Sequence, residues 1–153
     1  MSQTYFGSAL RSGSGTLTDT TDGGYVVLMQ TSTVTTNADG SASSTSVTIP
    51  SGSQIVDILI DQVQNETVGG GTATAINATV GTAAAGTQYL SATDVIGGGR
   101  AALTFTAAQL AAMADVGANT GVYLTVDPNG TIATTQGIYR LTVVYAQKRS
   151  EEH

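Results

Sequence analysis

Three carboxylates stand close together in the stretch QIVDILIDQVQNE, residues 54–66, which makes it the part of the chain most suggestive of chemistry. Asp57, Asp61 and Glu66 could supply a general acid and base, as in glycosidases, whose two carboxyl groups lie about 5 to 9.5 Å apart. The alternating pattern predicts a β-strand, on which Asp57 and Asp61 share one face at a separation of roughly 13 Å. We therefore expect solvated carboxylates on a sheet surface, and an acid site only if a neighbouring strand supplies a partner.

Other residue types that carry catalysis or bind metals are scarce. The single histidine is His153, the last residue of the sequence, and there is no cysteine. This composition disfavours a Ser-His-Asp triad, a Cys-His pair, a zinc site and a disulfide framework. The segment DTTDGG, residues 19–24, lacks the third alternating oxygen ligand and the bidentate glutamate of a calcium loop. We expect neither an enzyme nor a bound cofactor or metal.

Two glycine triplets, at residues 69–71 and 97–99, are a second possible signal of a binding site. Nucleotide-binding loops have the spacing GxGxxG or GxxxxGK[ST] and open a helix. Neither triplet has such an arrangement. We therefore interpret both as turns.

The charge balance disfavours nucleic acid as a partner. The formal net charge is −6, and the basic residues are Arg11, Arg100, Arg140, Lys148 and Arg149. A nucleic-acid binder needs its cations gathered to replace the counterions on phosphate. No apolar run approaches the roughly 20 residues that span a bilayer, and the first residues lack the pattern of a secretory signal.

Charged residues make up 10% of the chain, so Thr, Ser, Gly, Asn and Ala must cover most of its surface. Short side chains lose little rotamer entropy when a second surface fixes them, which favours a protein packed among neighbours. The same composition also follows simply from many strands and turns. The composition therefore fits both a protein packed among neighbours and a protein with many strands and turns.

Hydrophobic periodicity predicts one all-β domain. We expect a flexible arm over residues 1–24, a β-sandwich over residues 25–147 and a frayed tail over residues 148–153. β-Branched runs separated by turn signals predict the strands. The runs are YVVLMQTSTVTT, STSVTIP, QIVDILIDQVQ, TATAINATVGT, GVYLTVD and GIYRLTVVYAQ.

Period-two counting also assigns the faces of the main strands. In the stretch with the aspartates, the count places Val56, Ile58 and Ile60 on the apolar face, opposite Ile55, Asp57, Leu59, Asp61 and Val63. In the last strand it places Tyr139, Leu141, Val143 and Tyr145 together, and in the strand before it Val122, Leu124 and Val126. These residues are the expected core.

One short helix is expected over about residues 107–115. Thr106 is placed to cap it, and Gln109, three residues later, completes a capping box. Phe105 and Leu110 have the spacing of a hydrophobic staple. We expect the helix to plug the end of the sandwich.

The other end of the helix has its own signals. Gly117 is placed to terminate it in the left-handed conformation. The expected apolar face of the helix consists of Leu110, Met113 and Ala114.

The order of four segments resembles that of small virion proteins of tailed bacteriophages, the head decoration or cement proteins. The segments are IPSGSQIVDILIDQVQ, ATVGTAAAGTQYLSATDV, LTFTAAQLAAM and IYRLTVVYAQ. They contain a P-x-G-x-x-I-x-D-I strand, a G-T-x-x-x-G-x-x-Y segment and a closing strand. The resemblance spans about Tyr25 to Gln147 and does not include the arm.

The resemblance implies a jelly-roll-like β-sandwich with one short α-helix and an extended N-terminal arm. It further implies a non-enzymatic structural protein that cements the outer surface of a phage capsid by bridging capsid subunits. The implied partners are the major capsid protein and further copies of this chain in a homotrimer, with neither nucleic acid nor membrane. The implied location is the virion.

Within the arm, Tyr5, Phe6, Leu10 and Arg11 are the candidate contacts with the capsid or another subunit. The two aromatic residues lie in a segment with no core of its own, so they could anchor on a partner or tuck against their own domain. An alternative function is a receptor- or glycan-binding module of a phage fibre or adhesin. The absence of Trp and an aromatic content of 5% disfavour it, because sugar sites use stacking faces.

Overall fold

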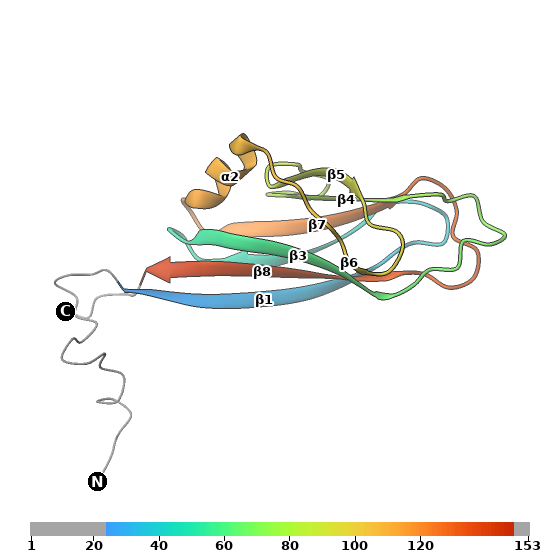
Figure 1. Ribbon diagram of the computed structural model, residues 1–153, viewed down its shortest axis with the longest axis horizontal. Coiled ribbons are helices and arrows are strands. Elements are labelled where there is room, and N and C mark those ends of the chain that lie inside the picture. Colours follow the sequence, from blue (N-terminus) through green and yellow to red (C-terminus); the bar gives the residue numbers. More distant parts are fainter. Residues whose placement is uncertain (1–23, 149–153) are drawn as a thin grey trace, which may run out of the picture.

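The computed structural model describes residues 24–148, which form two antiparallel four-stranded sheets packed face to face, with one short helix beside them (Figure 1). The first sheet has the order β1 (Tyr25–Thr35), β8 (Ile138–Lys148), β3 (Gln54–Gln64) and β6 (Gly99–Arg100). The second has the order β2 (Ser43–Ile49), β7 (Thr120–Pro128), β4 (Ile76–Gly81) and β5 (Leu90–Asp94).

The pairing of the strands is that of a jelly roll. β1 pairs with β8, β2 with β7, β3 with β6 and β4 with β5, as in one long antiparallel ribbon. Additional pairing of β3 with β8 and of β4 with β7 folds this ribbon into two sheets. The predicted all-β, jelly-roll-like sandwich is therefore confirmed. The predicted arm lies almost entirely outside the described residues.

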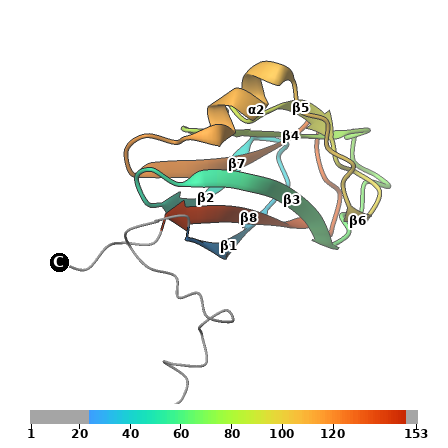
Figure 2. The ribbon, with the colours of Figure 1, turned by 60° about the vertical axis from the view of Figure 1, so that its left-hand side comes forward.

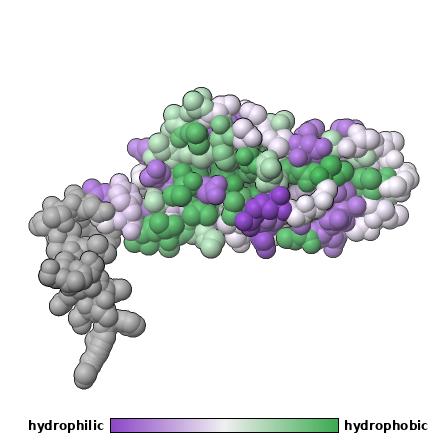
Figure 3. Space-filling model, in the orientation of Figure 1, coloured by the Kyte–Doolittle hydropathy of each residue, from purple (hydrophilic) through white to green (hydrophobic). Residues whose placement is uncertain are grey.

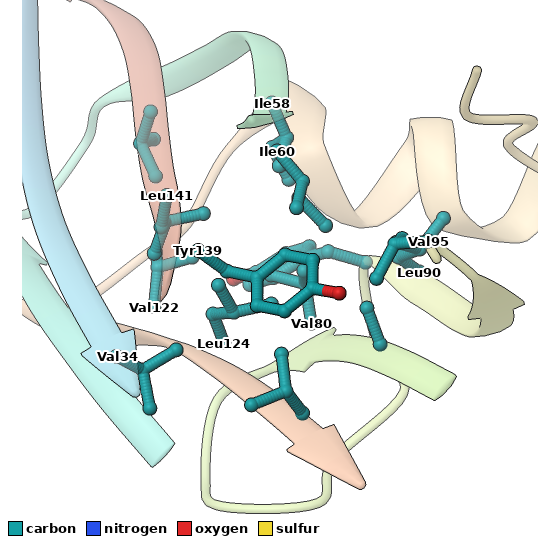
Figure 4. Packing of buried hydrophobic residues seen from close by; sticks show 14 of the residues in the cluster. Val34, Ile58, Ile60, Val80, Leu90, Val95, Val122, Leu124, Tyr139 and Leu141 are labelled. Atoms are coloured by element: carbon teal, nitrogen blue, oxygen red, sulfur yellow. The ribbon is translucent and has the colours of Figure 1, made fainter. Parts of the chain in front are cut away.

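The core lies between the two sheets and follows the predicted alternation in the last two strands. Val122, Leu124 and Val126 of β7 are fully buried. On β8 the four predicted residues, Tyr139, Leu141, Val143 and Tyr145, are buried, and Thr142 and Ala146 are buried as well. Figure 4 shows the ring of Tyr139 at the centre of this packing, between side chains of both sheets.

The predicted faces of β3 are wrong at its beginning. Ile55 is buried in the core, whereas Val56 is exposed. The reason is a register shift between Ile55 and Asp57 in the pairing with β8, which is a β-bulge. The extra residue reverses the alternation at this point, so Ile55 joins Ile58 and Ile60 inside.

Helix α2 (Ala107–Ala114) has the predicted N-terminus, and of its predicted apolar face Met113 is buried while Leu110 and Ala114 are exposed. The capping box of Thr106 and Gln109 is confirmed. Leu110 is 54% exposed, while Gln109 and Met113 are the buried residues. Gln109 can be buried because its amide nitrogen donates to the carbonyl of Thr87 at 3.2 Å and to Ser91 Oγ at 3.0 Å.

The helix closes a long side of the sandwich and not the end that was predicted; it lies next to β3 and β5, where β6 is only two residues long (Figures 1 and 2). Gly117 has the predicted left-handed conformation, with φ of 71°. It lies two residues beyond the C-cap residue Asp115, which is extended, so the helix itself ends earlier. No helix within residues 24–148 is long and apolar enough to cross a membrane.

Candidate interaction surface

The three carboxylates that first suggested chemistry do not converge. Asp57 is exposed on the outer face of the first sheet, as predicted, and its Oδ1 accepts from the N–H of Ile58 at 2.8 Å. Asp61 lies on the same face but is buried, and Glu66 bonds to residues of the inner face. Residues 24–148 contain no group of three His, Cys, Asp or Glu side chains that could hold a metal ion.

Asp61 is held by two arginines, which corrects the expectation of a solvated carboxylate. Arg100 donates to both its oxygens, at 2.8 and 3.1 Å, and Arg140 donates to Oδ2 at 3.3 Å. The hydrogen bond from Arg100 is the main cause that lowers the pKa of Asp61, and Arg140 adds to it. The same contact fastens β6 to β3, because Arg100 is half of that short strand. The role of Asp61 is structural.

This ion pair predicts a specific acid sensitivity. Because the pKa of Asp61 is depressed on folding, its contribution is complete above the unfolded pKa, about 4, and is lost as the pH falls through the folded value. We expect Asp61→Asn to lower the free energy of unfolding by about 1 kcal/mol at neutral pH and by less near about pH 2. Urea unfolding at both pH values measures this. Asp57→Asn is the matched control, and equal effects of the two variants would contradict the assignment.

Glu66 belongs to a second network at the rim of the core. The Tyr139 hydroxyl donates to Glu66 Oε1 at 2.7 Å and accepts from Gln62 Nε2 at 3.0 Å. Gln62 Nε2 also donates to Glu66 Oε2 at 2.7 Å. Burial, followed by the hydrogen bond to Glu66, raises the pKa of Tyr139 far above its usual value. These hydrogen bonds fix the orientation of the Tyr139 ring in the core. The hydroxyl stays protonated near neutral pH, so it cannot act there as a base.

The feature that distinguishes the surface is the beginning of β1. Three side-chain hydrogen bonds join the second half of β1 to β2. Gln30 Nε2 donates to the carbonyl of Thr48 at 2.8 Å, and the hydroxyls of Ser32 and Thr45 are hydrogen-bonded to each other. Ser43 Oγ donates to the carbonyl of Thr35 at 2.7 Å. Residues 25–29 precede these ties. Figure 1 shows this end of β1 projecting with β8 beyond the second sheet. We call residues Tyr25–Met29 the β1 overhang.

All five residues of the β1 overhang are large, apolar and exposed. Val27 and Met29 on the outer face are 64% and 67% exposed. Val26 and Leu28 point to the inner side, like Val34 in the core, yet they are still 43% and 41% exposed. Within residues 24–148 nothing covers the overhang on either face, and contiguous apolar patches of this kind are uncommon on a monomer.

The main chain of the β1 overhang is also open along one edge. Thr36, just beyond β1, donates its N–H to the carbonyl of Gly137 at 2.9 Å, so even-numbered positions point their polar groups towards β8. The register of β1 on β8 has no shift, and these groups alternate along an antiparallel strand. Tyr25, Val27 and Met29 therefore direct their N–H and C=O groups away from β8. Within residues 24–148, no strand pairs with this edge.

The apolar surface continues from the β1 overhang across the outer face of the first sheet. Met29 lies opposite Val144 of β8, which in turn lies opposite Asp57, and the exposed Val56 stands in the bulge beside Asp57. Figure 3 shows hydrophobic residues gathered over the half of the molecule that contains the β1 overhang. We call Tyr25, Val27, Met29, Val56 and Val144 the outer apolar face.

The sequence-based candidates for contact and this surface are different residues. Tyr5, Phe6, Leu10 and Arg11 lie outside the described residues, and so does His153. The β1 overhang was predicted only as part of a strand. The signal that could have identified it is the run YVVLM, five apolar residues without the alternation of a half-buried strand.

Comparison of the chain with models of protein families, with curated proteins and with solved structures finds no match. The candidate site is thus defined by its own geometry. That geometry is an exposed apolar surface beside a strand edge that no strand within residues 24–148 pairs with.

Proposed function

We propose that this chain is a non-enzymatic structural protein of a phage virion, which decorates the outer surface of the capsid and cements it by bridging capsid subunits. The observation that supports the proposal best is the outer apolar face. Exposed apolar residues concentrated on a single surface are typical of a protein that packs against another protein. The capsid as partner comes from the resemblance of the segment order to head decoration proteins.

Two further features agree with this function. The chain carries a net charge of −6, which suits the outside of a capsid better than an interior filled with phosphate. The five residues of the outer apolar face are uncharged, while Asp57 and Lys148 beside them are charged, so a contact centred on Val27 and Met29 keeps charges at its rim. Acidic residues elsewhere keep the free protein soluble.

The cementing effect depends on how many copies of the protein bind the capsid shell. A contact of standard size covers about 800 Å² on each partner, and such a contact alone gives modest affinity. Many copies around a closed shell act together, because each bound copy holds its neighbours at high effective concentration. The rigid jelly roll transmits load between the capsid subunits that it bridges.

Depletion of the protein from particles tests the function. We expect depleted particles to release their DNA at a lower temperature and after a milder osmotic shock than complete particles. Adding the purified protein back restores resistance. Unchanged release after depletion would reject cementing.

A variant pair tests whether the outer apolar face makes the contact. Val27→Thr with Met29→Thr keeps β-propensity and removes apolar area, so we expect binding to depleted shells to weaken at least tenfold. The matched control is Thr31→Ser with Thr33→Ser, on the same face of the same strand. If both variants bound the depleted shells equally well, the contact would have to lie on another surface. Specific binding on a glycan array without affinity for shells would favour the sugar-binding alternative.

A further inference from the structure

We propose that the open edge of the β1 overhang pairs with the same edge of a second copy, antiparallel and about a two-fold axis at Val27. The two first sheets then form one continuous sheet across the pair. This inference concerns a partner that the proposed function leaves unspecified, and it holds whether or not the assembled surface is a capsid.

The pattern of main-chain groups limits the register to axes that pass through a residue of β1. Only odd-numbered positions of β1 present N–H and C=O groups to the open edge, so odd positions must face odd positions. An axis at Val27 meets this condition, because it places Val27 opposite its own copy and Tyr25 opposite Met29 of the other. Three facing pairs with two bonds each give about six main-chain hydrogen bonds.

The same register matches the side chains. Tyr25 faces Met29 across the axis, a favourable contact between a thioether and an aromatic ring. Val26 faces Leu28 on the inner side. An axis at Val26 or Leu28 also sets odd positions opposite odd ones, but it would place Tyr25 opposite Val27 or Thr31. The run of five apolar residues is therefore self-complementary only about its own centre.

The strand lacks the features that normally protect an edge. Natural edge strands carry charges, prolines or bulges that prevent pairing between molecules. β1 contains no charged residue and no proline, and its register on β8 is continuous. An acidic protein repels its copies at most surfaces, but two neutral strands meet without a like-charge pair. A second copy is thus a partner that this edge accepts.

Part of the apolar surface of the β1 overhang adds to the main-chain hydrogen bonds of the pair. At the observed exposures, residues 25–29 present roughly 500 Å² of surface, close to the upper end for the largest apolar patch of a typical monomer. A standard interface covers about 800 Å² per partner, of which a little over half is apolar. Edge pairing covers the main chain and the flanks of these side chains and leaves the outer ones exposed, so the pair buries less apolar area than a standard interface and depends mainly on its main-chain hydrogen bonds.

Pairing would also enlarge the surface on which the proposed function rests. Edge pairing uses main-chain groups and leaves the outer side chains of both copies on one continuous face. The outer apolar face is thereby doubled, and its contact with a larger partner becomes bivalent. A two-fold pair differs from the homotrimer that the resemblance implies.

Charge exchange across the axis tests the pairing with the full chain. Tyr25→Glu and Met29→Lys, made separately, each bring a charge to an apolar position, and we expect each to raise the dimer dissociation constant at least tenfold. An equimolar mixture of the two, and the double variant, bring opposite charges face to face and restore the dimer. The charges of the double variant do not neutralise each other within one copy, because the positions lie roughly 13 Å apart. Thr33→Lys, on the same face beyond the overhang, is the matched control.

Sedimentation equilibrium measures the assembly, and circular dichroism and thermal unfolding check that each variant folds. A dimer lost in the single variants and recovered in the mixture and the double variant supports the pairing. A monomeric or trimeric full chain overturns it, and so does a dimer that the single variants leave intact. The recovered double variant is expected not to bind depleted shells, since its outer apolar face is charged. Failure of the pairing and failure of the capsid contact are therefore separate results.

Discussion

Replacing Tyr139 with alanine is expected to lower the free energy of unfolding by about 4 kcal/mol. The ring is fully buried at the centre of the core, between both sheets (Figure 4), so its removal leaves a cavity that neighbouring strands cannot fill. The substitution also removes the hydroxyl that donates to Glu66 and accepts from Gln62. Urea unfolding followed by circular dichroism measures the change.

The variant Tyr139→Phe separates the two losses. It keeps the ring and removes only the hydroxyl, so we expect a cost of about 1 to 2 kcal/mol from the disrupted hydrogen bonds. The raised pKa of Tyr139 gives a second readout. Its stabilisation is complete below the pKa of an unfolded tyrosine, about 10, and declines above it, so Tyr139→Phe should be less sensitive to alkali. Equal costs for the alanine and phenylalanine variants would show that the hydroxyl, and not the ring, dominates.

Sequence pattern predicted the fold class well because the strands that build the core are buried on one face along their whole length. In β7 and β8 the period of two selects the apolar core residues, and only Thr125, Thr142 and Ala146 are buried out of phase with it. β3 differs because its bulge depends on how the strand pairs with β8, which is a tertiary property. Counting along the chain cannot locate an inserted residue, so the faces of Ile55 and Val56 were exchanged.

The helix shows a related limit. Its N-terminus was predictable because a capping box is a local interaction between Thr106 and Gln109. Its buried face was not, because the choice between Leu110 and Gln109 depends on what covers the helix. The glutamine is buried because Thr87 and Ser91 satisfy its amide, and neither residue is near it in sequence.

The candidate site was the least predictable part. The structure places Asp57, Asp61 and Glu66 in three separate environments. The β1 overhang arises only because β2 ends before it, and the length of one strand relative to another is set by packing. Apolar side chains that look like core in the sequence thus lie at the surface.

The glycine triplet at residues 69–71 is part of a close backbone contact, and we expect Gly71→Ala to lower the free energy of unfolding by about 3 kcal/mol. A Cβ atom at Gly71 would lie 2.3 Å from the carbonyl oxygen of Thr131 and 3.0 Å from the nitrogen of Ala133. Both are main-chain atoms, so they cannot rotate away as a side chain would. The Thr131 carbonyl is further fixed by accepting from the N–H groups of Thr72 and Ala73, each at 3.0 Å.

Gly69, in the same triplet, provides the matched control. A Cβ atom there meets nothing within 4 Å, and its backbone is outside the left-handed region. Gly69→Ala should therefore leave stability within about 1 kcal/mol of the parent, or raise it slightly by restricting the unfolded chain. Urea unfolding of the two variants side by side measures the difference. If both substitutions were equally tolerated, the triplet would be a plain flexible turn, as its sequence suggested, and the backbone contact with Thr131 would contribute little to the stability of this end of the sandwich.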